Sequence, residues 1–171
     1  IVADSLLDID GVIFVEKIDS FTVKMHYYNN DGSSAELCVN GIRCVAKFAL
    51  DNSIVDSNEV TVVAPIGNVK TKVKGNIVSL EVSIPTYEEN KLLIDGLECI
   101  KSNIGNPHLL VEVENVDKFD LEQFVQKVYD TNEFESGVNV EIFNMYDKKI
   151  INARVYERGV GETDACGSGA V

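Results

Sequence analysis

The sequence predicts an α+β fold made of two similar halves, each rich in strands and each carrying one principal helix. Three observations support this prediction. Short alternating apolar segments fit strands, two segments have helical spacing, and an internal repeat lies on either side of a polar linker. A chain of 171 residues suits one domain of ordinary size or two small domains packed together.

Strand patterns dominate the first half of the chain. Residues 11–15 form a short apolar run, and residues 21–28 alternate, with Val23 and Met25 on one face. This alternation is typical of strands that bury one face and expose the other.

A hairpin is the clearest local prediction. Apolar residues alternate with lysines over residues 69–74, and the Gly75-Asn76 pair is typical of a tight turn. The returning strand continues the apolar face with Val78, Leu80, Val82 and Ile84.

Two segments have the spacing of amphipathic helices. Residues 40–51 form the first, with Ile42, Val45, Ala46 and Ala49 on one face. Residues 120–130 form the second, with Leu121, Phe124, Val125 and Val128 on one face. Asp120 is a suitable N-cap for the second helix, because its carboxylate can accept an N–H of the first turn.

A polar segment divides the chain almost in half. Residues 85–90 begin with Pro85 and contain mostly polar residues, so they are the best candidate for a linker. The predicted halves are residues 1–84, which carry Cys38, and residues 85–171, which carry Cys166.

An internal repeat relates the two cysteines. Tyr28 precedes Cys38 by ten residues, and Tyr156 precedes Cys166 by ten residues. In both places an acidic residue lies two positions before the cysteine and a glycine lies three positions after it. A lone cysteine is often a small buried filler, but two in matching frames indicate a pair that faces one site.

The charge balance excludes several classes of partner. With 28 acidic and 15 basic side chains, the formal net charge is −13. This charge argues against nucleic acid or an anionic membrane as partner, because phosphate groups would be repelled. Hydrophobic residues make up 45% of the chain, which is typical of a globular domain. No apolar run approaches the roughly 18–20 residues that span a bilayer.

The cysteines favour a reducing environment. Cys38, Cys44, Cys99 and Cys166 include no Cys-x-x-Cys pair and are too few for a disulfide scaffold. We therefore expect reduced thiols and a cytoplasmic protein. Cys44 lies nearly two helical turns after Cys38 and is assigned to packing, and Cys99, in an apolar strand, is assigned to the core.

The sequence around Cys38 and Cys166 predicts a sulfur at a helix N-terminus in each half. Unpaired N–H groups and the positive end of the helix dipole stabilise a thiolate there, lowering a thiol pKa of about 8.5 by a unit or more. The same N–H groups can hold a substrate carboxylate. If one sulfur removes a proton from a carbon and the other delivers one from the opposite face, a stereocentre inverts without a cofactor.

At these residues the sequence resembles the diaminopimelate epimerase family. The resemblance covers nearly the whole chain, and its matching segments occur in the family's order. These segments are residues 28–33, 38–44, 105–108, 137–139 and 156–163, the last continuing through 165–169. The final segment is highly specific, whereas Gly-Asn-Pro-His at 105–108 is weak by itself.

The resemblance implies roles for individual residues. Cys38 and Cys166 correspond to the two catalytic acid/base residues. Asn29, Asn106 and Asn139 correspond to positions that bind the polar ends of the substrate, for which an amide offers both a donor and an acceptor.

The resemblance also implies a second substrate subsite. Glu157 and Arg158 correspond to a pair that grips the distal amino-acid end, and Glu157 is also expected to tune the site. His108 corresponds to a histidine that orients or tunes a neighbour. Backbone N–H groups that would hold the reacting carboxylate belong to Val39, Asn40, Gly167 and Ser168.

One position departs from the family pattern. Val39 stands where the family usually has glycine. Because the role of this residue rests on its backbone N–H, a valine can serve only if its φ angle is negative. Its branched side chain would also narrow the pocket, which bears on the choice of substrate.

The family resemblance further implies an architecture. Each half would be a strongly curved, mainly antiparallel sheet around a central helix, with the active site in the cleft between the halves. It also implies a homodimer. No metal, nucleotide or pyridoxal cofactor is implied, because the sequence has neither a glycine-rich phosphate loop nor metal-ligand spacing. Because the family has segments before Ile1 and beyond Val171, we expect a truncated chain that is unstable or inactive alone and a full-length parent that is the enzyme.

The implied activity is the conversion of LL-diaminopimelate to meso-diaminopimelate, a step of lysine and cell-wall precursor biosynthesis. A related amino-acid racemase, such as a histidine racemase, is the first alternative. A binding module that has lost turnover is a second alternative. A thiol–disulfide switch between Cys38 and Cys166 is a third, and it is compatible with epimerase activity.

Overall fold

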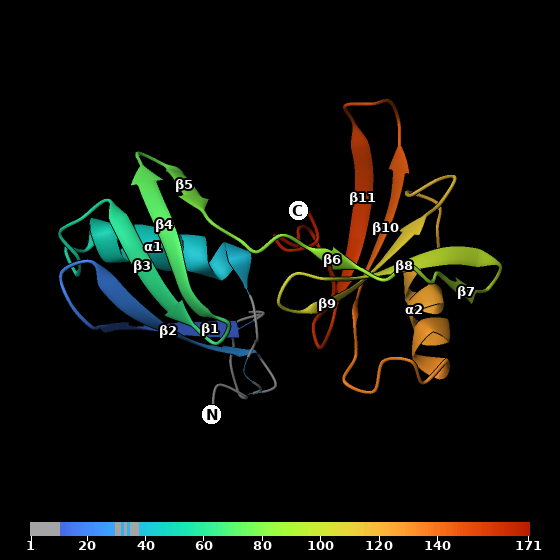
Figure 1. Cartoon of the computed structure of the whole chain (residues 1–171), viewed down its shortest axis with the longest axis horizontal. Coiled ribbons are helices and arrows are strands. Elements are labelled where there is room, and N and C mark those ends of the chain that lie inside the picture. Colours follow the sequence, from blue (N-terminus) through green and yellow to red (C-terminus); the bar gives the residue numbers. More distant parts are fainter. Residues whose placement is uncertain (1–10, 30–31, 33, 35–37) are drawn as a thin grey trace. The chain divides into compact units, whose positions relative to one another are not determined.

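The chain folds as two compact units, Ile1–Ser83 and Ile84–Val171 (Figure 1). This fold is taken from a computed structural model, which describes residues 11–29, 32, 34 and 38–171. Each unit has a sheet and one helix within these residues, as expected for the predicted α+β class. The predicted division lies one residue later, between residues 84 and 85.

The first unit is a five-stranded sheet with one helix in its described part. Its elements are β1 (Gly11–Lys17), β2 (Thr22–Asn29), α1 (Val39–Asp51), β3 (Glu59–Ala64), β4 (Gly67–Lys74) and β5 (Ile77–Leu80). The strand order is β1–β2–β3–β4–β5, and every neighbouring pair is antiparallel except β2 and β3. The connection between these two parallel strands contains α1, as a crossover requires.

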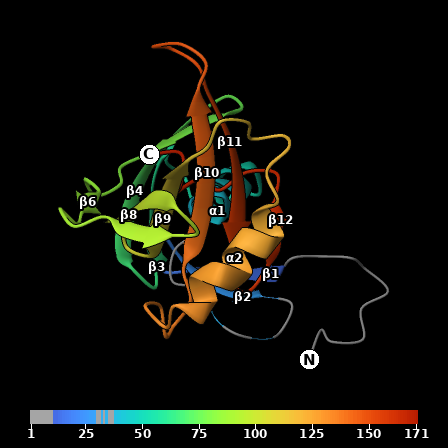
Figure 2. The same cartoon turned by 90° about the vertical axis from the view of Figure 1, so that its right-hand side faces the viewer.

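The second unit also has one sheet and one helix, with more strands. Its elements are β6 (Thr86–Tyr87), β7 (Leu92–Ile94), β8 (Leu97–Asn103), β9 (Pro107–Glu112), α2 (Leu121–Asp130), β10 (Asn139–Met145), β11 (Ile151–Glu157) and β12 (Gly161–Thr163). The order is β12–β11–β10–β9–β8–β6, with β7 also paired to β8. Only β9 and β10 run parallel, and α2 connects them. Figure 2 shows α2 lying along this sheet.

Both helices form where the sequence predicts them. Ile42, Val45, Ala46 and Ala49 make up the buried stripe of α1, packed with sheet residues such as Val23 and Val62. In α2 the N-cap is Asp120, whose Oδ1 accepts the N–H of Gln123 at 3.0 Å. Of the described helices, at 13 and 10 residues, neither is long and apolar enough to cross a membrane.

The internal repeat is present in the backbone. The two predicted catalytic cysteines are 128 residues apart (166 − 38), and the same offset separates the start of β1 from that of β10 (139 − 11). The hairpins β1–β2 and β10–β11 share one register under this offset. Tyr28 then bridges Ser34, as Tyr156 pairs with Glu162. The expectation of two pseudo-symmetric halves is therefore confirmed.

Three local predictions need correction. The returning strand of the predicted hairpin ends at Leu80, and Ile84 is 89% exposed, because the chain leaves β4 there to enter the second unit. The predicted linker contains β6, in which Thr86 pairs with Asn103. Cys44 is exposed, so its assignment to packing was wrong. It lies off the stripe formed by residues 42, 45, 46 and 49, whereas Cys99 is fully buried as predicted.

The N-cap of α2 provides a test of the fold. Replacing Asp120 with alanine removes the acceptor for the Gln123 N–H, and we expect the free energy of unfolding to fall by about 1 kcal/mol. Asp120→Asn keeps a side-chain oxygen and should cost only a few tenths of that. Urea unfolding followed by circular dichroism measures both values. Equal losses for the two variants would show that the cap hydrogen bond is not the cause.

Candidate active site

Cys38 lies at the N-terminus of α1, as the sequence predicts. It is the N-cap residue, with an extended backbone (φ −128, ψ 92), and its Sγ accepts the N–H of Gly41 at 3.2 Å. Its carbonyl accepts the N–H of Ile42, which closes the first turn. The first turn contains no acidic residue. The positive end of a 13-residue helix therefore faces the sulfur without a competing carboxylate in that turn.

The backbone at Val39 suits the role implied for it. Val39 is the first residue of α1, and it is not among the described residues with positive φ, which besides glycines are Ser53, Asp95 and Asn132. The valine is therefore unstrained there. The side chain is buried.

A close approach to the sheet favours glycine at position 41. A β-carbon there would lie 2.9 Å from Met25 Cε and 3.0 Å from both Ile13 Cδ1 and Cys38 Sγ. The ends of these side chains would have to move to make room for a β-carbon, so glycine favours the close approach of α1 to the β1–β2 hairpin.

Cys166 has a similar local setting in the second unit. Its half-buried Sγ lies 3.3 Å from Ser168 Oγ and accepts the backbone N–H of Gly169. The acceptor–donor spacing of three residues equals that of Cys38 and Gly41. Residues 167–170 form a turn. The Val171 N–H donates to the Ser168 carbonyl at 3.4 Å, as in a first helical turn.

Burial raises the pKa of the Cys166 thiol above its ordinary value. The donors from Ser168 and Gly169 lower that pKa, whereas the charges of Glu157 and Glu141 raise it further. The expected lowering of the thiol pKa at this position is therefore wrong for Cys166, because desolvation disfavours the thiolate more than the donors favour it.

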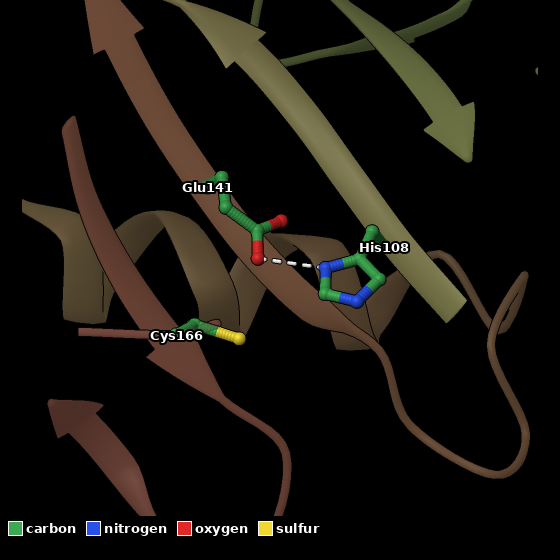
Figure 3. Close-up of side chains that lie close together, drawn as sticks. All are labelled: His108, Glu141 and Cys166. Carbon is green, nitrogen blue, oxygen red and sulfur yellow. Dashed lines mark hydrogen bonds and ion pairs between the residues drawn. The ribbon is translucent and has the colours of Figure 1, made fainter. Parts of the chain in front are cut away.

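A buried polar cluster lies beside Cys166 (Figure 3). His108 Nδ1 is 2.7 Å from Glu141 Oε1, and these side chains are 3% and 6% exposed. His108 Nε2 is 3.0 Å from Asn106 Oδ1, and Asn106 Nδ2 donates to Ser168 Oγ at 3.4 Å. The chain of contacts reaches Cys166 through Ser168.

Glu141 was not among the predicted site residues. Its side chain is buried in β10 between Val140 and Ile142. A single carboxylate within an otherwise apolar stretch was the available signal, because such a residue is buried only where it has a partner.

The same cluster has the composition of a metal site. His108, Glu141 and Cys166 offer ligand atoms that all lie within 4.8 Å of one another. The histidine and carboxylate atoms that would bind an ion instead share the 2.7 Å hydrogen bond. The geometry is therefore that of a hydrogen-bonded cluster.

The predicted distal subsite comes together in the second unit. Asn139 Oδ1 accepts the N–H of Arg158 at 2.9 Å, and its Nδ2 donates to the Pro107 carbonyl at 3.1 Å. Glu157 Oε1 accepts from Thr163 Oγ1 at 2.6 Å. Asn139 thus braces the loop that carries Arg158.

Gly137 is required beneath Arg158. It has φ +75, and a β-carbon there would lie 2.8 Å from Cγ and Cδ of Arg158. The Arg158 Nη1 donates to the Ser136 carbonyl at 3.1 Å. These contacts explain why the segment at 137–139 accompanies the one at 156–163.

The predicted site residues fall into two groups, one in each unit. Asn29 ends β2 and is half-buried, as are Cys38 and Asn40 at the start of α1. In the second unit the structure brings the predicted residues into one neighbourhood: Asn106, His108, Asn139, Glu157, Arg158, Cys166, Gly167 and Ser168. Residues 30, 31 and 33 of the segment 28–33 lie outside the described residues, as does the acidic residue before Cys38.

Comparison with known proteins gives a consistent family. The family model described as "Diaminopimelate epimerase" matches residues 4–84 and 100–171. A diaminopimelate epimerase of Methanococcus maripaludis is 35% identical over 94% of this chain and 66% of its own length. The Thermotoga maritima enzyme of that name is also 35% identical, over 98% of this chain and 68% of its own. This chain thus spans about two thirds of the length of these relatives.

Solved structures share the fold at low sequence identity. A probable proline racemase from Agrobacterium radiobacter K84 superposes with a TM-score of 0.71 and 15% identity, over 93% of this chain and 57% of that one. A PhzF-family phenazine biosynthesis protein of Bacillus anthracis superposes with a TM-score of 0.67 and 17% identity, over 94% of this chain and 63% of that one. At this identity the likeness concerns the fold, which agrees with the predicted class.

The thiol of Cys166 should titrate above an ordinary cysteine. Burial opposes its ionisation, so we expect the rate of alkylation by iodoacetamide to reach half its maximum above about pH 8.5, the pKa of a model thiol. Peptide mass spectrometry resolves the labelled Cys166 from the other cysteines. In urea the pH midpoint of alkylation should return to the pKa of an unperturbed thiol. A folded-state midpoint at or below that value would show that the donors outweigh burial.

Proposed function

The chain belongs to the diaminopimelate epimerase family, and on that premise we propose that it carries the two acid/base thiols of a cofactor-independent amino-acid epimerase. The proposed reaction converts LL-diaminopimelate to meso-diaminopimelate. The observation that carries this proposal is the matched setting of Cys38 and Cys166, each accepting an N–H from the glycine three residues later.

The two settings support different resting forms of the thiols. Cys38 faces the N-terminus of a complete helix, which favours a thiolate. The pKa of Cys166 is raised by burial, which favours a thiol. One thiolate and one thiol are what inversion requires, because the first removes the α-proton while the second delivers a proton to the other face.

The reacting carbon needs further help, because a carbon beside a carboxylate is a weak acid. Backbone N–H groups of Val39, Asn40, Gly167 and Ser168 are proposed to hold that carboxylate. Fixed donors of this kind stabilise the charge that develops as the α-proton leaves.

The distal end of the substrate is proposed to bind Glu157 and Arg158. A diamino-dicarboxylic acid carries an ammonium and a carboxylate there, which suit a carboxylate and a guanidinium respectively. Asn29, Asn106 and Asn139 complete the proposed contacts, either directly or by bracing the binding loops. The half-buried Glu157 is already oriented by Thr163.

We propose a homodimer acting in the cytoplasm, in lysine and cell-wall precursor biosynthesis. The expected homodimer is measured by sedimentation equilibrium.

Solvent exchange at the α-carbon tests the proposed reaction. In D₂O the protein should incorporate deuterium into LL-diaminopimelate and form the meso isomer. Cys38→Ala and Cys166→Ala should each lower epimerisation by at least about 100-fold, because each removes one acid/base group. Cys44→Ala is the matched control, since Cys44 is exposed on α1 and outside the site, and it should retain full activity.

The outcome across candidate amino acids separates the alternatives. Deuterium exchange into histidine or another amino acid, and not into diaminopimelate, would indicate a related racemase with that amino acid as its substrate. Binding of diaminopimelate without exchange, unchanged by Cys38→Ala, would indicate a binding module. Full activity in either active-site cysteine variant would contradict the two-thiol reaction.

A further inference from the structure

Glu141 occupies a position that holds an isoleucine in the first unit. Ile13 and Glu141 are 128 residues apart (141 − 13), the offset of the repeat. Each lies against the glycine that follows the cysteine of its own unit, Gly41 or Gly169. Glu141 is only 5% exposed. A buried carboxylate is costlier than an isoleucine, so packing alone does not account for the glutamate.

The contacts of Glu141 lead to the sulfur of Cys166. Glu141 Oε1 and His108 Nδ1 are 2.7 Å apart, and His108 Nε2 lies 3.0 Å from Asn106 Oδ1. Asn106 Nδ2 reaches Ser168 Oγ at 3.4 Å, and that oxygen is 3.3 Å from Cys166 Sγ. Asn106, His108 and Ser168 are all buried, so water contributes little to these bonds.

In one arrangement of this chain, every donor points toward Cys166. When Asn106 presents its oxygen to His108 and its amide N–H to Ser168, His108 Nε2 is the donor. If Nδ1 donates to the Glu141 carboxylate as well, the ring is an imidazolium. Ser168 accepts from Asn106, which leaves its hydroxyl proton for Cys166 Sγ. In this arrangement the sulfur receives a donor and is suited to be a thiolate.

The opposite arrangement combines a turn of the Asn106 amide with the loss of one proton from His108. With a neutral His108, Nε2 becomes an acceptor, and Asn106 must present its N–H there and its oxygen to Ser168. Ser168 then donates to Asn106, and its oxygen accepts the S–H of Cys166. The number of protons in the cluster is conserved, because Nε2 loses one proton and Sγ gains one.

We propose that Glu141 and His108 are positioning residues that set the protonation state of Cys166 through Asn106 and Ser168. The Glu141 carboxylate stabilises the imidazolium, the imidazolium orients Asn106, and Asn106 frees the Ser168 hydroxyl for the thiolate. The catalytic meaning of this relay rests on the proposed function, in which Cys166 exchanges a proton with substrate.

Direct electrostatics and the relay predict changes of opposite direction in the pKa of Cys166 when Glu141 is neutralised, so an experiment can distinguish them. The described charged and titratable groups that face Cys166 are Glu157 from β11, Glu141 from β10 and His108 from β9. By charge alone, Glu141 raises the pKa of Cys166. Neutralising Glu141 would then lower that pKa, whereas loss of the relay would raise it.

The test is the pH midpoint of Cys166 alkylation by iodoacetamide, read by peptide mass spectrometry on the whole chain. Glu141→Gln keeps the shape against Gly169 but removes the charge, and it should raise the midpoint by about one pH unit. Ser168→Ala should also raise it, because the donor to the sulfur is lost. In the Ser168→Ala background, Glu141→Gln should lower the midpoint or leave it unchanged.

The other cysteines provide controls in the same sample. Cys99 is fully buried and Cys44 is exposed, so protection of Cys99 reports folding and labelling of Cys44 reports the reagent. If Glu141→Gln exposes Cys99, His108→Gln replaces it and should raise the midpoint in the same way.

Two results would overturn the relay. A midpoint lowered or unmoved by removing Glu141 or His108 in the otherwise native chain would leave only direct charge effects. An equal rise with and without Ser168 would show that the contacts do not transmit the effect. Alkylation needs no turnover, so a missing exchange reaction would count against the proposed function and leave this test intact.

Discussion

The hydrogen bond from a glycine N–H to the cysteine sulfur three residues earlier is the interaction on which the candidate site depends. It places Cys38 Sγ over the first turn of α1 and gives Cys166 the same local partner. The absence of a side chain at both glycines matters for a second reason. A β-carbon at Gly169 would overlap Glu141 of the neighbouring strand, and one at Gly41 would press on Ile13. Each sulfur is therefore held at a fixed depth relative to its sheet.

Around that shared contact the two units differ in chemistry. The residues beside Gly41 are apolar, Ile13 and Met25, and the helix that follows Cys38 is complete. Beside Gly169 lies the buried pair of Glu141 and His108. One thiol thus lies at the N-terminus of a helix, and the other lies near a buried carboxyl and imidazole that share a hydrogen bond. In the proposed reaction, the repeated backbone would supply the symmetry that an inversion needs, and the differing side chains would distinguish the acid from the base.

Much of the fold could be predicted from periodicity. The stripe of α1, the N-cap Asp120 and the hairpin turn at Gly75 all depend on neighbours in sequence, and the repeat was visible in the spacing of Tyr28 and Cys38. The exposure of Cys44 could have been deduced from the same stripe. The end of β5 could not, because Val82 and Ile84 continue the alternation after the chain has left its partner strand.

The site was less predictable than the fold. Motif resemblance located most of its residues, but the raised pKa of Cys166 depends on its burial, which no local pattern encodes. Glu141 was missed for a similar reason, since its partner His108 is 33 residues away in sequence and adjacent only across β9 and β10. The bracing of Arg158 by Asn139 likewise joins segments that meet only in the folded sheet.

The second oxygen of that glutamate, Oε2, has no hydrogen-bond partner within the part of the chain that the structure describes. A buried oxygen in this condition weakens the native state, and natural proteins keep such weak points chiefly where activity requires them. The second unit therefore buries an oxygen without a described partner at the position where the first unit has the apolar side chain of Ile13. Removing Glu141 alone would leave the buried His108 Nδ1 without its partner, so laboratory evolution toward heat resistance should replace the glutamate and the histidine together by apolar residues.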